Sequence, residues 1–286
     1  MNSPLLLRRP GLARLLLWSL CAALVATPTW AQASSTQGTI TDQQFLDYLR
    51  QLAIASPAAT PQAAQFGVIS GFGLPHGTAF ASGVLTDRRE RRAQRDYDGS
   101  ASLGVGFGNA REAVGVDITL GIISTTPSEF AEDGNLNLKM HRQLPGLMPG
   151  GVSSVAVGVG NLVRWGDAQE VDQNRYVSGS TLLPLTTSGG RALPVMLSAG
   201  HGTAISDLGR EADSFFGAGV GLTTRFSASA SWAGDEWITG VTWLERDLNM
   251  QVTLAMGDAT DRLGEGRRYI LAVAFVFDDV FSRWGR

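Results

Sequence analysis

From about residue 77 to residue 278, bulky apolar side chains alternate with small ones, one residue at a time. In residues 114–122 every second residue is valine, isoleucine or leucine, and the residues between them include Gly115, Asp117 and Thr119. Side chains of a β-strand point alternately to opposite faces, so a period of two predicts strands. Each predicted strand has one continuous apolar face and one small or polar face.

About twelve segments carry this pattern, within a range of ten to fourteen. They lie near residues 77–86, 97–108, 111–124, 134–142, 151–165, 173–183, 193–201, 212–224, 226–233, 236–244, 247–257 and 268–278. Most are longer than the roughly 5–6 residues usual in soluble sheets and close to the ~9–11 that cross a membrane at a tilt. No run of 18 apolar residues occurs, which excludes membrane-spanning helices.

The small face of these strands distinguishes a membrane barrel from a soluble sheet. Charged residues make up 17% of the chain, against a typical ~25%, and they concentrate between the strands. Glycine, serine, alanine and threonine fill the face that a soluble protein would cover with charge. A bulky face toward lipid and a small, polar face toward a lumen explains both facts. We therefore predict an all-β fold, a closed antiparallel transmembrane β-barrel of about twelve strands.

Connection lengths and aromatic residues support the same prediction. With the amino terminus in the periplasm, the predicted outer loops are mostly longer than the inner turns, as in transmembrane barrels. Aromatic residues fall near the predicted strand ends, where membrane interfaces favour them. These residues are Tyr97, Trp165, Tyr176, Trp232, Trp237, Trp243 and Tyr269.

The first 65 residues differ from the rest. Residues 1–33 combine arginines, an apolar run from Leu15 to Val25 and small residues ending at Ala33, the pattern of a secretory signal peptide. The single cysteine, Cys21, lies in this leader, so the exported chain would have no disulfide. Residues 34–65 contain one predicted short helix, over 41–56, and a linker. Residues 66–286 are the predicted barrel domain.

The chain resembles bacterial outer-membrane barrels and, more narrowly, an uncharacterised group of glycine-rich, porin-like barrel proteins. The resemblance rests on DGSASLGVGFGNAREAVGVDITLGIIS (98–124), GNLNLKMHRQLP (134–145), GVGNLVRWGD (158–167) and RYILAVAFVF (268–277). It implies the barrel fold and a location in the outer membrane of a Gram-negative cell, and it assigns no catalytic residue. Such chains usually end in an aromatic residue on the last strand. Here nine residues follow Phe277, the last residue of the RYILAVAFVF segment.

Four charged residues are candidates for lining a pore. If the strands around 111–124 and 134–142 form a hairpin, Asp117 lies opposite His141 on the small face, with Lys139 two residues away. Such a cluster would either line a pore or fasten neighbouring strands. Arg164 joins this set because it has the parity of Ala156 and the glycines after it.

A dense basic loop follows the first predicted strand. Its guanidinium groups would contact lipopolysaccharide phosphates, select anions in a pore, or simply face solvent. The loop contains Arg88, Arg89, Arg91, Arg92 and Arg95. Outer-membrane lipid is the expected partner. The net charge of −3 gives no indication of nucleic-acid binding.

Three functions fit these features. The first is a narrow porin-like channel for small polar solutes, and the second is a non-conducting structural or assembly barrel. The third is a membrane-embedded lipid hydrolase using Ser198, His201, Ser206 and Asp207, although their spacing matches no hydrolase motif. The three histidines lack metal-ligand spacing, so neither a metal site nor a cofactor is expected.

Overall fold

The computed structural model describes residues 63–87, 97–123, 130–145, 147–148, 150–188, 190, 192–264 and 266–282. The predicted leader (1–33), the predicted helix (41–56) and the basic loop containing Arg88, Arg89, Arg91, Arg92 and Arg95 lie outside these residues.

Twelve β-strands make up nearly all the regular structure of the described residues, joined in part by two short 3-10 helices. The strands are β1 (Ala79–Asp87), β2 (Tyr97–Gly108), β3 (Gly115–Ile122), β4 (Gly134–Leu144), β5 (Val152–Trp165), β6 (Asn174–Thr186), β7 (Ala192–Ser206), β8 (Glu211–Gly221), β9 (Phe226–Ala233), β10 (Trp237–Glu245), β11 (Met250–Gly257) and β12 (Arg268–Phe277). The 3-10 helices are η1 (Gly166–Glu170) and η2 (Asp207–Gly209).

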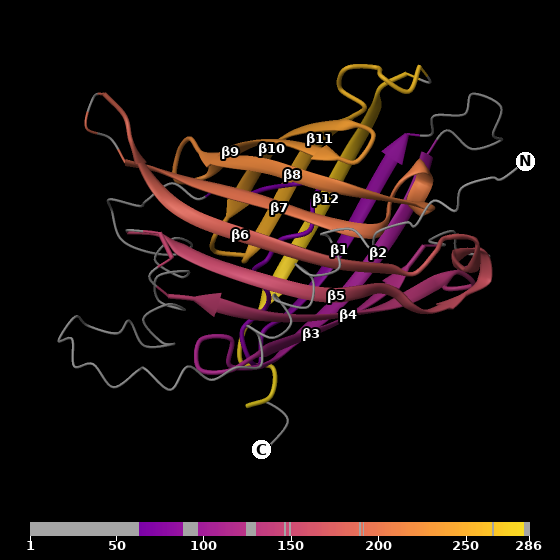
Figure 1. Ribbon diagram of the computed structural model, residues 1–286, viewed down its shortest axis with the longest axis horizontal. Helices are drawn as coiled ribbons and strands as arrows, with labels where there is room; N and C mark the ends of the chain where they lie inside the picture. Colours follow the sequence, from indigo (N-terminus) through magenta and orange to yellow (C-terminus); the bar gives the residue numbers. More distant parts are fainter. Residues whose placement is uncertain are drawn as a thin grey trace, which may run out of the picture. The chain divides into compact units, whose positions relative to one another are not determined.

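The strands form a closed antiparallel barrel, which confirms the predicted fold class (Figure 1). Each strand pairs with its neighbours in sequence, and β12 pairs with β1 to complete the ring. Two predicted strands, 97–108 and 226–233, have the bounds of β2 and β9. The strand predicted over 193–201 was too short, because β7 continues to Ser206 past a register shift after Gly202. That irregularity interrupts the alternation on which the prediction depended.

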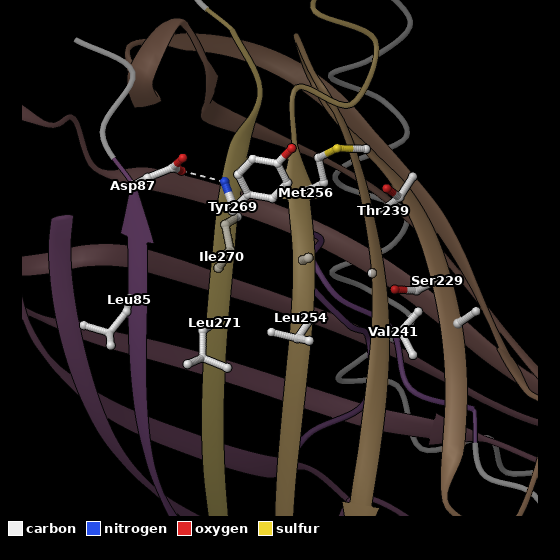
Figure 2. A pocket seen from close by; sticks show the side chains of 13 residues that line it. Leu85, Asp87, Ser229, Thr239, Val241, Leu254, Met256, Tyr269, Ile270 and Leu271 are labelled. Carbon is white, nitrogen blue, oxygen red and sulfur yellow. Dashed lines mark hydrogen bonds between the residues drawn. The ribbon is translucent and has the colours of Figure 1, made fainter. Parts of the chain in front are cut away.

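The outward face of the barrel is apolar. Leu85 pairs with Leu271, Leu271 with Leu254, and Leu254 with Val241, which gives an apolar row across β1, β12, β11 and β10. Figure 2 shows these four side chains next to one another. Each is at least 37% exposed, and Leu254 reaches 63%. They line a shallow hollow of about 780 Å³ whose rim includes Tyr269, Met256 and Asp87.

The inward face carries small and polar residues, as the alternation predicted. Serines and threonines, not leucines, are the commonest buried side chains on this face. Apolar exceptions include Phe215 and a small cluster of Ile238, Ala255 and Ile270, against which Phe66 packs from inside the barrel. The molecule therefore has a polar interior and an apolar exterior, the reverse of a soluble domain.

The lengths of the strand connections follow the prediction that one end of the barrel has mostly longer loops than the other. The four longest, 88–96, 123–133, 166–173 and 258–267, all join strands at the same end of the barrel. At that end Trp232 and Trp237 pack edge to face on the outside of the β9–β10 hairpin. The interface position predicted for Tyr176 was wrong, because this side chain points inward and lines a cavity in the lumen. The direction of the Tyr176 side chain follows from its parity in β6 and not from its nearness to a strand end.

Candidate functional site: the barrel lumen

Asp117 is the centre of a charged cluster inside the barrel. Lys139 Nζ lies 3.0 Å from Asp117 Oδ2, and His141 Nε2 lies 3.4 Å from Asp117 Oδ1. The predicted register was wrong by two residues, because Asp117 pairs with Lys139 and His141 pairs with Gly115. A shift of two leaves every side chain on its original face. The structure therefore brings together the three residues that the sequence predicted, with a different partner opposite the carboxylate.

The cluster is well removed from solvent. Asp117 is 5% exposed and His141 is 3% exposed, whereas the side chain of Lys139 is 21% exposed. A carboxylate in such a position is stable when charged donors and N–H groups surround it. Asp117 and Lys139 supply one charge of each sign, so the pair adds no net charge to the lumen.

A segment that precedes the first strand lies inside the barrel and reaches this cluster. Leu74 donates its backbone N–H to Asp117 Oδ1 at 3.0 Å, and Lys139 Nζ donates to the carbonyl oxygen of Phe72 at 2.8 Å. We call residues 64–76 the strap. In Figure 1 its indigo trace runs inside the ring of strands before it joins β1. The strap was not predicted, because residues 34–65 were assigned to a helix and linker and residues 66–286 to the barrel domain.

The strap is bound along a row of small residues on the inward face. Ser154 pairs with Ser180, Ser180 with Ser198, Ser198 with Gly217, and Gly217 with Ser231, so one position from each of five strands, β5 to β9, is in register. We call these five residues the serine row.

Three serines of this row bind the strap directly. Ser180 Oγ accepts the backbone N–H of Gly71 at 2.8 Å and lies 3.2 Å from Ser70 Oγ. Ser198 Oγ donates to Gln65 Oε1 at 2.6 Å, and Ser231 Oγ donates to the carbonyl oxygen of Phe66 at 2.7 Å. The strap is therefore fixed to the wall from β3 to β9.

Glycines allow the strap and the wall to approach closely. A Cβ atom on Gly73 would lie 2.2 Å from His141 Cδ2, and one on Gly219 would lie 2.1 Å from the carbonyl oxygen of Ala64. Real Cβ atoms do not come so near other heavy atoms, so both positions require glycine. Glycine on the small face thus has a specific use here, which is to make room for a chain inside the barrel.

Two cavities flank the strap. One, of about 410 Å³, is lined by Asp117, Lys139, Tyr176 and the strap residues Phe72 and Leu74. The other, also about 410 Å³, is lined by His141, Arg111, Gln143 and the strap residues Gly73 to His76. Gly73 and Leu74 border both cavities. The strap therefore divides the lumen at the level of the charged cluster.

Arg164 lies away from the cluster. It pairs with Asn135 on the inward face, four residues along β4 from Lys139 and so roughly 13 Å away. Its guanidinium donates to the carbonyl oxygen of Val171, just after η1. Arg164 thus lies on the inward face that its parity in β5 predicted, but the structure does not bring it to Asp117.

Two of the residues considered for a lipid hydrolase, Ser198 and His201, are not brought together. Ser198 points into the lumen, where it binds Gln65, whereas His201 has the opposite parity in β7 and is exposed on the outward face. His201 Nδ1 lies 3.2 Å from Ser214 Oγ. A nucleophile and a base on opposite faces of one strand cannot exchange a proton directly.

The described residues also bear on metal binding and on helical membrane spans. They contain no group of three or more histidine, cysteine, aspartate or glutamate side chains that could hold a metal ion. No helix among them has the length and hydrophobicity needed to cross a membrane.

No protein-family model matches the chain, and no curated protein matches it. Among solved structures it is similar to the outer membrane protein Omp33 of Acinetobacter baumannii, with 11% identity and a TM-score of 0.40 over 71% of this chain and 98% of that one. An outer membrane channel from Pseudomonas putida F1 gives 12% identity and a TM-score of 0.39, over 72% and 97% of the two chains. A mutant of the porin of Rhodopseudomonas blastica gives 10% and 0.33, over 70% and 99%.

Proposed function

We propose that this barrel spans the bacterial outer membrane. The apolar row of Leu85, Leu271, Leu254 and Val241 supports this proposal, because it exposes large side chains across neighbouring strands of the outer wall. Soluble monomers rarely expose contiguous apolar patches of such extent. Membrane fractionation followed by heat-modifiable gel migration tests the proposal. Recovery in the soluble periplasmic fraction would contradict it.

Within that membrane, the function best supported is a narrow channel for small polar solutes. The observation that carries this proposal is the polar lumen, in which Asp117, Lys139 and His141 border two cavities. In transmembrane barrels a polar interior is the feature that admits water and solutes. Arg164, further along the same face, is a fourth pore-lining residue in this proposal.

Conductance across a planar bilayer tests the channel directly. The full-length exported chain should give discrete current steps. Because the strap divides the lumen, the open state should be rare and short-lived. The absence of any current, both in this protein and in variants whose contacts to the strap have been removed, would exclude a channel while leaving the membrane barrel intact.

A non-conducting structural barrel is the second candidate, and the strap itself favours it. Phe66 packs against the buried cluster of Ile238, Ala255 and Ile270, and several hydrogen bonds hold the rest of the strap. A barrel with a permanently filled lumen would serve as a rigid membrane element. The two candidates differ in whether the strap ever leaves the wall.

The basic loop after β1 extends the proposal to lipid. It contains the arginines from Arg88 to Arg95 and follows Asp87, whose carboxylate borders the outward hollow. Lipopolysaccharide phosphates are the proposed partner, bound by paired guanidinium hydrogen bonds. Replacing all five arginines by glutamine should weaken binding of the purified barrel to lipopolysaccharide. Unchanged binding would exclude this role.

A further inference from the structure

Side chains of the lumen wall bind the strap mainly at the strap's backbone. Ser231 donates to the carbonyl oxygen of Phe66, and Ser180 accepts the N–H of Gly71. Lys139 donates to the carbonyl oxygen of Phe72, and Asp117 accepts the N–H of Leu74. These backbone groups occur in every peptide. Strap side chains contribute bonds through Gln65 and Ser70.

The wall supplies both donors and acceptors to the strap backbone. It donates to the carbonyl oxygens of Phe66 and Phe72 and accepts the N–H groups of Gly71 and Leu74, so a peptide segment bonds to it in both directions. The glycines of the wall allow close approach, since Gly217 faces the side chain of Gln65 and Gly219 faces the backbone at Ala64. Such an arrangement is a binding site for a peptide strand.

The contacts that hold the strap are also separable. Apart from the packing of Phe66 against Ile238, Ala255 and Ile270, they are individual hydrogen bonds to side chains, and residues 63–78 belong to none of the barrel's strands. Open space lies on both sides of the strap, because Gly73 and Leu74 border one cavity on each side. Displacement of the strap would join these cavities into one passage.

We infer that the inward wall from β3 to β9 is a peptide-binding site, which the strap fills in cis and thereby closes the channel. The strap is then an autoinhibitory gate. Short peptides that lack a net charge are the class of ligand that this wall would bind once the strap leaves. The inference rests on the proposed channel function.

A disulfide between strap and wall tests the gate. Ser70 Oγ and Ser180 Oγ are 3.2 Å apart, so S70C/S180C, in a background with Cys21→Ser, brings two thiols near bonding distance. The oxidised full-length protein should lose its current steps in a planar bilayer, and reduction should restore them. The matched control is T242C/T253C, which joins two hydroxyl positions 2.9 Å apart within the wall. Its current should be the same before and after reduction.

Loosening the strap tests the binding site. S198A/S231A removes the serine hydroxyls that bond Gln65 and Phe66, and it should raise the open fraction on the order of tenfold. The matched control is S178A/S227A, which removes two buried inward hydroxyls that have no hydrogen-bond partner. A synthetic peptide of residues 64–76, added to the loosened variant, should return the current toward zero. A peptide of the same composition in reversed order should have a weaker effect.

The outcomes separate the two proposals. Equal currents in the oxidised and reduced S70C/S180C protein, with current steps present, would overturn the gate and leave the channel intact. Equal block by the forward and reversed peptides would overturn the specific peptide site. No current from any variant, with correct folding shown by heat-modifiable migration, would overturn the channel and the gate together.

Discussion

Leu74 donates its backbone N–H to Asp117 at 3.0 Å, so a residue located before the first strand is fixed to the middle of the third. This bond joins the two halves of the candidate site, since Asp117 also contacts Lys139 and His141. The Asp117 carboxylate therefore holds the strap and balances the charge of Lys139 at the same time.

Replacing Asp117 by alanine should destabilise the folded barrel by about 2 to 4 kcal/mol. Lys139 would keep a charge in the lumen without its partner, which costs more than the pair contributes when intact. D117N should cost less, because the amide oxygen still accepts the N–H of Leu74. Urea titration in detergent measures both values. D167A, at an exposed carboxylate, is the control and should stay within ~0.5 kcal/mol.

Adding a methyl group at Gly219 should push the strap from the wall. The new Cβ would meet the carbonyl oxygen of Ala64 at 2.1 Å, so the strap must shift. A cysteine introduced at Ser70 should then react several-fold faster with a water-soluble thiol reagent. G160A is the inward control, because the nearest atom to its Cβ is 3.5 Å away. If G219A leaves the labelling rate unchanged, the strap is not held by close approach at this glycine.

A charge in the apolar row should impair insertion into the membrane. L254R places a guanidinium on the outward wall, which costs about 2–4 kcal/mol near the middle of a bilayer. L147R is a matched control on a connection, since Leu147 and Leu254 are 60% and 63% exposed. The fraction recovered in outer membranes should fall for L254R alone. Equal recovery of both variants would indicate that lipid does not cover this wall.

Removing the ring of Phe281 should loosen the end of the chain. This ring lies 5.2 Å from the rings of both His76 and Phe107, so it ties the tail to β2 and to the base of the strap. F281A should lower the free energy of unfolding by about 1 kcal/mol. F130A, on an exposed loop residue, should leave it unchanged. A loss no larger for F281A than for F130A would show that the ring contacts contribute nothing.

The barrel could be predicted from the sequence because its strands follow a local rule. Alternation with period two sets the direction of each side chain, and an error of two residues in register, as at Asp117, changes no face. For the same reason Asp117, Lys139 and His141 could be placed together in the lumen. Arg164 was given the correct face, but its distance from the cluster depends on the register of β4 and β5.

The strap could not be predicted because no local rule determines its place. Its residues have no period, and their partners are remote in sequence: Phe66 binds Ser231, and Gly71 binds Ser180. The glycines at 71 and 73, together with Ser70, were the available signal. Glycine in a segment without strand periodicity is typical of a flexible linker, and it is equally typical of a segment that lies close to another backbone.

The position of the strap in the chain has a consequence for how the barrel is built. It continues into β1 at Ala79, and β1 is the strand that closes the ring by pairing with β12. A segment joined to the closing strand is enclosed most simply when it is already in place as the first and last strands meet. Assembly of the wall and filling of the lumen are thereby one event, whereas a barrel closed around an empty lumen would have to admit the strap into a finished ring.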